Sequence, residues 1–276
     1  MNYPSFSVLM SVYIKEKPEY LRESILSVLN QTALPDEIVL VKDGPLTIEL
    51  EAVINEFIDN DILKIVEIKE NVGLGKALNK GLLECRNGII ARMDTDDIAK
   101  PERFEKQLEH FMHNPTLSVL GSAVEEFIDN PNNIIAYNTV KTEYESIKKT
   151  IKFRNPIIHP TVMFKKEDVI NSGSYKDWHL NEDYYLWIRM IQRDYVFKNI
   201  NEPLVSMRIT NETYLRRGGW RYFITQKKLF DYMLKSKTIN IFEYLYNNGI
   251  RFVTRILVPN NIRKQMYLKM LRKKKV

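Results

Sequence analysis

The sequence contains one cysteine and no long hydrophobic run, and each absence excludes a class of protein. The single cysteine, Cys85, permits no internal disulfide and fits a reducing compartment. It lies in a helical pattern, where a small buried side chain is expected rather than a nucleophile. No stretch of about 18 apolar residues occurs, so a transmembrane helix is not expected. The first residues lack a basic segment followed by an apolar one, so a signal peptide is not expected either.

Net positive charge is absent outside the C-terminal end, although the chain of 276 residues has a net charge of +6. Residues 242–276 hold nine Lys or Arg and a single acid, Glu243, which leaves the remainder of the chain with a net charge of −2. A nucleic-acid groove needs a basic surface across the fold. We therefore expect no nucleic-acid partner.

Apolar runs of strand length alternate with helical patterns in the first half of the chain. The predicted strands cover residues 5–13, 37–41, 62–68 and 88–93. The predicted helices begin at Pro18, near residue 47, after Asn71–Gly75 and at Pro101. Alternation at this spacing predicts βαβ units and a mostly parallel sheet, that is, an α/β fold.

The second half of the chain is less regular. Further strands are predicted at residues 117–128 and 160–164, and helices at residues 143–153 and from Glu182 onwards. After residue 220 the pattern is helical, with segments at residues 220–236, 239–249 and 261–273. The length suits one large domain or two small ones, and no internal repeat or low-complexity linker is present.

The strand at residues 88–93 is followed by three carboxylates within four positions, Asp94, Asp96 and Asp97. Carboxylates this close repel one another unless positive charge lies between them. Mg²⁺ and Mn²⁺ take oxygen ligands and often share them with a substrate diphosphate, and open α/β sheets bind ligands at strand ends. The stretch therefore indicates a metal–diphosphate site or, alternatively, an acidic turn that caps the next helix.

Longer strings of residues carry a family resemblance. They are VKDGPLT (41–47), NVGLGKALNKG (71–81), ARMDTDD (91–97), NPIIHPTVMF (155–164) and RRGGW (216–220), with Glu182-Asp183 before the last. As a set they resemble glycosyltransferase family 2, and the likeness covers about residues 5–215. The fuller strings are similar to those of transferases in bacterial capsule, O-antigen and exopolysaccharide (amylovoran-type) biosynthesis.

The resemblance implies a GT-A fold, a Rossmann-like, mostly parallel sheet flanked by helices. It divides the chain into a catalytic domain at residues 1–219 and a helical, basic extension at residues 220–276. Within the domain, about residues 1–100 are expected to form the nucleotide-sugar half and residues 101–219 the acceptor half.

The resemblance also implies two sets of site residues. Those expected to contact the base, ribose and diphosphate of a nucleotide sugar are Val12, Tyr13, Asp43, Arg92, Asp94 and Thr95. Asp96, together with Asp94, is expected to hold a divalent cation, Mn²⁺ or Mg²⁺. Asp183 is expected to be the general base, with Glu182 beside it near the acceptor. Acids are also common at helix N-termini, so this last pair by itself is not specific.

The implied activity is that of an inverting glycosyltransferase in surface polysaccharide biosynthesis. It moves a sugar from a nucleotide-diphospho sugar, with a UDP sugar as the expected donor, to a hydroxyl of a glycan or of an acceptor on polyprenyl diphosphate. A bound cation neutralises the departing diphosphate, and a carboxylate activates the acceptor hydroxyl. Two alternatives are a catalytically silent, membrane-associated partner in a polysaccharide assembly complex and a metal-dependent phosphatase.

The chain departs from the family pattern at two places near these motifs. Lys42 stands where a second Asp is often found. Many relatives carry a metal-binding His about 25 residues beyond the base, whereas the corresponding segment here, residues 207–211, has none. His159, which precedes Pro160, is expected to be a hydrogen-bonded structural residue.

The C-terminal tail has the pattern of a basic amphipathic helix. Its apolar positions, Ile262, Met266, Met270 and Leu271, share one helical face among Lys and Arg side chains. Such a helix is typical of contact with an anionic membrane surface, and the alternative is a solvated helix packed on the protein. We expect a cytoplasmic enzyme, peripheral on the inner face of the cell membrane.

Overall fold

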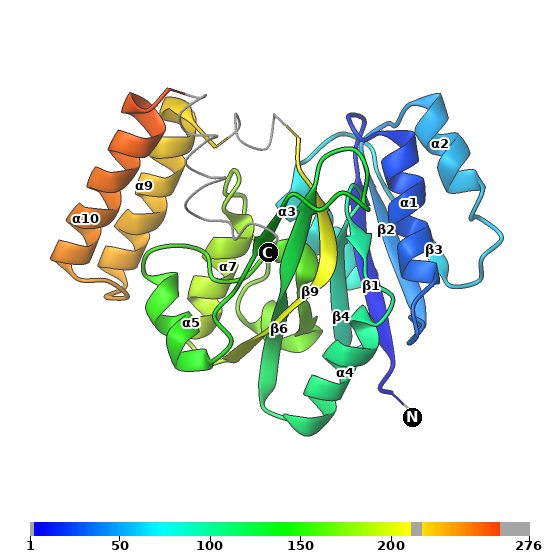
Figure 1. The fold of residues 1–276 in the computed structure, drawn as a ribbon, viewed down its shortest axis with the longest axis horizontal. Coiled ribbons are helices and arrows are strands. Elements are labelled where there is room, and N and C mark those ends of the chain that lie inside the picture. The colour runs from blue at the N-terminus through cyan, green and yellow to red at the C-terminus, as the bar shows by residue number, and fades with distance from the viewer. Residues whose placement is uncertain (1–2, 211–216, 260–276) are drawn as a thin grey trace.

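A mixed nine-stranded sheet forms the centre of the molecule, and helices cover both of its faces (Figure 1). The structure is a computed structural model that describes residues 3–210 and 217–259. Within these residues the strand order is β3-β2-β1-β4-β8-β6-β9-β5, with β7 beside β6. The α/β fold predicted from the sequence is confirmed.

The first half contains the predicted alternation of strands and helices. Its elements are β1 (Phe6–Val12), α1 (Pro18–Leu29), β2 (Glu37–Asp43), α2 (Ile48–Asn55), β3 (Leu63–Ile68), α3 (Leu74–Glu84) and β4 (Ile89–Asp94). Strands β1 and β2 are buried on both faces, which is why each reads as a continuous apolar run.

The second half supplies the remaining strands and the C-terminal helices. Its elements are β5 (Ile98–Ala99), α4 (Arg103–His113), β6 (Leu117–Phe127), β7 (Ala136–Asn138), α5 (Tyr144–Ile151), the short 3₁₀ helix η1 (His159–Thr161), β8 (Met163–Lys165), α6 (Lys166–Asn171), α7 (Glu182–Ile191), β9 (Val196–Arg208), α9 (Gly219–Lys235), α10 (Ile241–Phe252) and the π-helical turn η2 (Val253–Leu257). The helix predicted at residues 261–273 lies outside the described residues.

One strand prediction in this half was wrong, and one long strand was not predicted. The strand expected at residues 160–164 begins only at Met163, because His159–Thr161 form a 3₁₀ turn around Pro160, which has no N–H for a ladder. Strand β9 was missed, although its 13 residues make it the longest described strand. It contains Pro203 and pairs with β6 through shifts in register, which break the alternation that marks a strand.

The parallel ladders bring the ends of three strands to one edge of the sheet. Strand β1 pairs in parallel with β2 on one side and β4 on the other. Ser11 is opposite Asp94, and Val12 is opposite Lys42. The segments that follow β1, β2 and β4 therefore meet at the carboxyl edge, where α/β sheets bind ligands.

Two hydrophobic clusters fill the space between the sheet and its helices. One joins alternate residues of β1, such as Val8 and Met10, to α1, α2 and α4. The other joins Leu9 to α3, α7 and α9. Helix α9 contributes Leu229 and Phe230 to this second cluster, so it packs on the same core as the sheet. The predicted division of the chain after residue 219 stays a prediction.

Cys85 is buried, as the sequence predicted, and burial raises the pKa of its thiol to about 12. A thiol with so high a pKa is a poor nucleophile at neutral pH. Among the described residues, no helix has both the length and the apolar character that crossing a bilayer requires.

Glycine is required where β2 turns towards the loop before α3. Gly44 has a φ of +89°, and a Cβ placed there would lie 2.8 Å from the Asn71 backbone nitrogen. Gly73 also has a positive φ, +87°, but a Cβ there would meet no atom within 4 Å. Gly88 has neither restriction. Comparing the three glycines therefore separates the energetic cost of a positive φ from that of a steric contact with the added Cβ.

We expect alanine substitutions at these glycines to lower the free energy of unfolding in the order Gly44, Gly73, Gly88. Gly44→Ala should cost about 2–4 kcal/mol, because a positive φ and a close contact act together. Gly73→Ala should cost about 1–3 kcal/mol from conformation alone, and Gly88→Ala within about 0.5 kcal/mol. Urea unfolding measures all three, and equal losses at Gly44 and Gly88 would contradict the prediction.

Candidate active site

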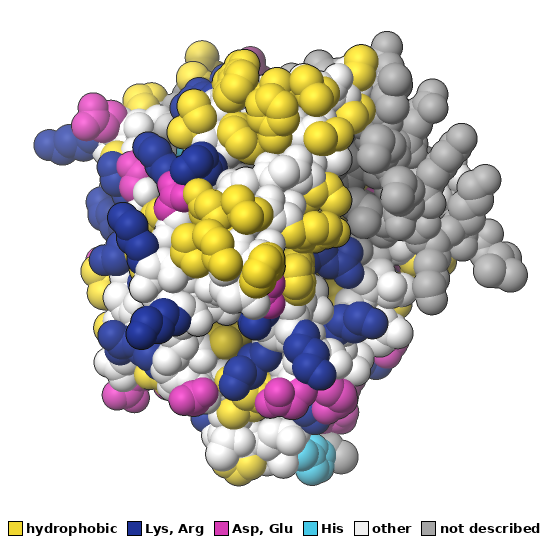
Figure 2. All heavy atoms as spheres, turned by 90° about the vertical axis from the view of Figure 1, so that its left-hand side faces the viewer, with side chains coloured by type: hydrophobic (Ala, Val, Ile, Leu, Met, Phe, Trp, Pro, Cys, Tyr) yellow, Lys and Arg dark blue, Asp and Glu magenta, His cyan; other side chains and the backbone are white. Residues whose placement is uncertain are grey.

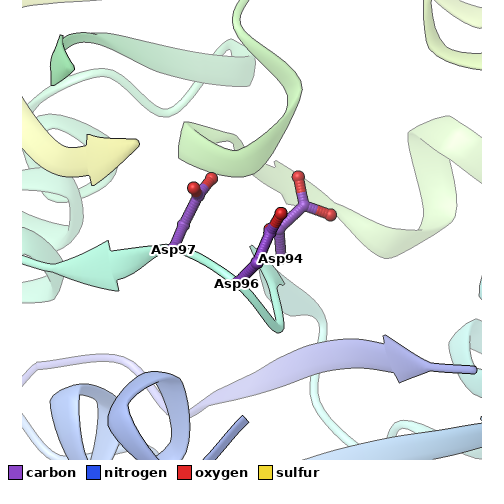
Figure 3. A group of neighbouring side chains, drawn as sticks. All are labelled: Asp94, Asp96 and Asp97. Carbon is purple, nitrogen blue, oxygen red and sulfur yellow. The ribbon is translucent and has the colours of Figure 1, made fainter. Parts of the chain in front are cut away.

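An acidic turn follows the central strand β4 at the carboxyl edge of the sheet. One carboxylate oxygen each from Asp94, Asp96 and Asp97 lies within 4.8 Å of the others. Figure 3 shows the three side chains pointing to the same side of the turn. The sequence analysis singled out the same three carboxylates, and the family resemblance implied Asp96 and Asp94 as the metal ligands among them.

Arg92, two residues before Asp94 on β4, is buried beneath this turn with 2% of its surface exposed. Its Nη2 donates to Asp94 Oδ1. Its Nε and Nη1 have no hydrogen-bond partner in the part of the chain that the structure describes. A buried guanidinium with unused donors is suited to an anionic ligand. Arg92 and Asp94, two residues expected to face the diphosphate, are therefore already hydrogen-bonded to each other.

Arg208, at the end of β9, forms hydrogen bonds to two residues of the acidic turn. Its backbone N–H donates to Asp97 Oδ1 at 2.8 Å, and its Nε donates to the Asp96 carbonyl at 3.0 Å. The guanidinium carbon lies 3.8 Å from the ring centre of Tyr20 and 4.5 Å from that of Phe127. Burial and the charges of its acidic neighbours raise the pKa of Asp97 well above its usual range. Asp97 is therefore hydrogen-bonded to Arg208 of β9. This arginine belongs to residues 207–211, the segment in which many relatives carry a metal-binding His.

A second acidic pair, Glu182 and Asp183, begins helix α7, where the helix dipole favours negative charge. Asp183 Oδ2 accepts a hydrogen bond from Asn155 Nδ2 at 2.7 Å, and its Oδ1 accepts one from the Tyr184 backbone at 2.7 Å. Burial, followed by the charge of Asp183, raises the pKa of Glu182 to about 7. Burial also raises the pKa of Asp183. Both carboxyls are thus poised as proton acceptors.

Arg92 interacts electrostatically with both acidic groups. Burial raises the pKa values of Glu182, Asp183 and Asp97, and the positive charge of Arg92 offsets part of each rise. Burial also raises the pKa of Tyr175 well above its usual range, and the charges of Asp183, Glu182 and Asp94 add to that rise. Arg92 therefore pairs with the turn expected to hold the diphosphate and also acts through its charge on the pair expected to activate the acceptor.

Helix α3 fixes the loop between α6 and α7 that carries Tyr175. Asn79 donates to the Tyr175 carbonyl at 2.6 Å and accepts from its backbone N–H at 2.9 Å. A Cβ at Gly75 would lie 3.4 Å from the Glu182 Cβ, so α3 packs closely against the start of α7. The string NVGLGKALNKG thus positions the Glu182–Asp183 pair, a role not predicted for it.

His159 is hydrogen-bonded as expected, because its Nε2 lies 3.0 Å from the Tyr175 hydroxyl. Burial and the nearby Arg92 lower its pKa well below the usual range. It is therefore neutral at physiological pH and orients Tyr175.

The remaining predicted nucleotide-binding residues lie at the same edge of the sheet. Val12 is buried and Tyr13 is 44% exposed at the end of β1. The Asp43 carboxylate accepts hydrogen bonds from the backbone N–H groups of Val72 and Gly73, at 2.8 and 3.1 Å, and therefore holds the loop before α3. Its contact with base or ribose stays a prediction.

Thr95 is buried, and its hydroxyl donates to Glu16 Oε2 at 2.7 Å. Burial raises the pKa of Glu16. This bond ties the acidic turn to the segment after β1. The role of Thr95 in binding the donor stays a prediction as well.

The residues of the acidic turn fit a hard divalent cation. All three offer carboxylate oxygens, the donor type that Mg²⁺ and Mn²⁺ prefer. Two ligands on opposite sides of Mg²⁺ are about 4.2 Å apart, so small side-chain movements would let one ion join these oxygens. Asp94 and Asp97 each already accept a hydrogen bond, from Arg92 and from the Arg208 backbone, so an ion at this turn would share both carboxylates with an arginine. That Asp96 and Asp94 hold the cation stays a prediction. Neither Glu182 nor Asp183 belongs to this group of potential ligands.

The sequence model described as "Glycosyl transferase family 2" matches residues 7–172 of the chain. The chain belongs to glycosyltransferase family 2. It is therefore a glycosyltransferase, and the resemblance found in the sequence is confirmed. The matched residues include β1, the acidic turn and His159, and they end before the Glu182–Asp183 pair.

The chain is similar to two named glycosyltransferases over nearly their whole length. It is 37% identical over 270 residues to the UDP-Gal:alpha-D-GlcNAc-diphosphoundecaprenol beta-1,3-galactosyltransferase of Escherichia coli, covering 98% of both chains. It is also 37% identical over 264 residues to the amylovoran biosynthesis glycosyltransferase AmsE of Erwinia amylovora, covering 96% of this chain and 98% of that protein.

A solved structure supports the fold. The crystal structure of S. aureus TarS 1–349 in complex with UDP-GlcNAc aligns with a TM-score of 0.66 at 15% identity, covering 96% of this chain and 76% of that chain. This likeness confirms the GT-A architecture of the family 2 enzyme.

Four residues of the site were not predicted from the sequence: Glu16, Asn155, Tyr175 and Arg208. Asn155 begins the string NPIIHPTVMF, which resembles the family but suggested no role for its first residue. Glu16, Tyr175 and Arg208 are single side chains in no motif. Only their long-range contacts show that they belong to the site.

Proposed function

We propose that this family 2 enzyme moves a sugar from a UDP sugar to a hydroxyl of a lipid-linked glycan in surface polysaccharide biosynthesis, with inversion at the anomeric carbon. The observation that carries the proposal is Arg92, which is buried, pairs with Asp94 of the acidic turn and acts through its charge on Glu182 and Asp183. A transferase needs an anion site for the leaving diphosphate near a base for the acceptor. Arg92 connects the residues that we propose for these two roles.

In this mechanism Arg92 binds the diphosphate and balances the negative charge that develops on it. Asp96 and Asp94 would hold a divalent cation, which would supply further neutralisation of the leaving group. Asp183 takes the proton from the acceptor hydroxyl, whose oxygen forms the new bond to the anomeric carbon. The bond from that carbon to UDP breaks on the opposite side. Asn155 keeps Asp183 oriented for this step.

The relatives support the choice of donor and acceptor. The E. coli relative is named for UDP-Gal and for a GlcNAc residue on diphosphoundecaprenol, and the Erwinia relative is named for amylovoran biosynthesis. We therefore propose UDP-Gal as the first donor to test and a polyprenyl-diphosphate-linked amino sugar as the first acceptor. An acceptor on polyprenyl diphosphate places the enzyme at the inner face of the cell membrane.

The test is a transfer assay with the full chain, a panel of UDP sugars and GlcNAc-diphospholipid. We expect UDP release that depends on acceptor and on Mn²⁺ or Mg²⁺, and a product whose new linkage has the opposite anomeric configuration, read by NMR coupling constants. A retained configuration would contradict the proposed base. Release of inorganic phosphate from phosphomonoesters would instead support a phosphatase, and the absence of both nucleotide binding and turnover would support a silent partner.

A further inference from the structure

Helix α10 has its polar side chains inside and its apolar side chains outside. Its two buried residues are Asn247 and Arg251. Asn247 donates to the Lys152 carbonyl at 3.0 Å, and the Arg251 guanidinium lies over the Phe230 ring at 4.3 Å and bonds to the Phe153 carbonyl. A surface helix normally turns its apolar face to the core. This reversal means that the outer face of α10 is not explained by folding alone.

The apolar residues on that outer face follow the spacing of one helical stripe. We call them, with two residues of α9, the apolar face of the α9–α10 pair: Trp220, Ile224, Ile241, Phe242, Leu245, Tyr246, Ile250, Val253 and Leu257. Phe242 is 79% exposed, and Leu245 is 59% exposed. Figure 2 shows hydrophobic side chains gathered in one broad area at this end of the molecule. Contiguous apolar surface of this kind marks an interaction site.

An aromatic trio joins α9 to the end of α10 within this face. The rings of Trp220, Phe223 and Phe252 pack edge to face, with centroids 5.8–6.0 Å apart. Trp220 nevertheless keeps 59% of its surface exposed. Trp and Tyr favour the boundary between lipid and water, because they combine an apolar ring with a polar group.

The charge of the C-terminal segment indicates which kind of partner binds this face. Residues 242–276 carry nine Lys or Arg against the single acid Glu243. A symmetric contact with a second copy would bring two such basic segments together, which is unfavourable. An anionic bilayer instead attracts each of these residues by about 1 kcal/mol when they are close to it. The combination of apolar face and basic sequence therefore favours lipid.

We infer that the apolar face of the α9–α10 pair inserts into the interfacial layer of an anionic bilayer. An interfacial helix buries its apolar side about 5–10 Å into that layer. The inference goes beyond the predicted basic tail, because it assigns membrane contact to a folded part of the enzyme. It also relates the membrane to the active site, since α9 packs on the same hydrophobic core as α7, whose first turn carries Asp183.

Flotation of the full-length protein with phosphatidylglycerol-containing vesicles tests the inference, and it needs neither donor nor acceptor. The variant Phe242→Gln/Leu245→Gln removes two exposed apolar side chains while keeping good helix formers. Its matched control, Ile48→Gln/Leu83→Gln, changes equally exposed residues of α2 and α3; α2 lies at the other end of the molecule (Figure 1). Thermal unfolding confirms that both variants fold.

We expect the wild type and the control to float with the vesicles. The α10 variant should bind the vesicles at least about tenfold more weakly. The difference between variant and control should persist at high salt, where attraction of the basic tail is screened. Equal flotation of all three proteins, or no flotation of the wild type, would overturn the inference. So would sedimentation without vesicles showing a wild-type dimer that the α10 variant converts to a monomer. A failed flotation leaves the transfer assay untouched, so the two proposals are judged separately.

Discussion

Replacing Asp183 with Asn should lower kcat by about 10²–10⁴-fold while leaving donor binding nearly unchanged. The range is what a positioned general base contributes to a proton transfer. Asn has the size of Asp but cannot accept the proton of the acceptor hydroxyl. The acidic turn that is expected to bind the donor lies on another element, at the end of β4. Steady-state kinetics with varied donor and acceptor separate these effects.

The pH profile decides between Asp183 and its neighbour as the base. A base works only when deprotonated, so kcat must fall as the pH falls through its pKa. Burial raises the pKa of both carboxyls, and that of Glu182 reaches about 7. If Asp183 is the base, Glu182→Gln keeps most of the activity and the acidic limb of the profile. If Glu182→Gln instead abolishes a limb near pH 7 together with the activity, the assignment of Asp183 is wrong.

Much of the nucleotide half of the fold could be predicted because its signals are local. Strands buried on both faces read as apolar runs, and parallel strands end at a common edge, so Asp43 and Asp94 could be placed near each other from the sequence. The same reasoning failed for β9. Its partner β6 lies about 80 residues away, and the irregular register between the two strands hides any alternation.

The contacts that support the site could not be predicted because they join distant segments. Arg208 reaches the acidic turn across 112 residues, and Tyr175 meets Asn79 across 96. Nothing in the residues around Arg208 distinguishes it from an ordinary surface arginine. Asp43 shows the reverse case: the motif predicts a nucleotide contact, whereas the structure shows its carboxylate holding the loop at Val72 and Gly73. A motif residue can therefore shape the loops of a site in addition to any contact that it makes with the ligand.

Replacing Asp96 with Ala should abolish the metal-dependent stabilisation of the enzyme by UDP. A ligand present at about 100 times its dissociation constant adds about 2.7 kcal/mol of stability, which is roughly 5–10 °C in Tm for a chain of this size. In the wild type this shift should require Mn²⁺ or Mg²⁺, because the carboxylates of the acidic turn would hold the cation that neutralises the diphosphate. Without Asp96 the remaining shift should be the same with and without the cation.

Asp97→Asn is the matched control for this measurement. It also removes a carboxylate from the acidic turn, but the amide oxygen can still accept the Arg208 backbone N–H that Asp97 accepts at 2.8 Å. If Asp94 and Asp96 hold the cation and Asp97 mainly anchors the turn to β9, this variant keeps most of the metal-dependent shift. Equal loss in both variants would instead make all three carboxylates ligands. A full shift with UDP alone in the wild type would mean that the arginines at the turn bind the diphosphate without a cation, and Arg92 would then carry the role assigned to Asp96.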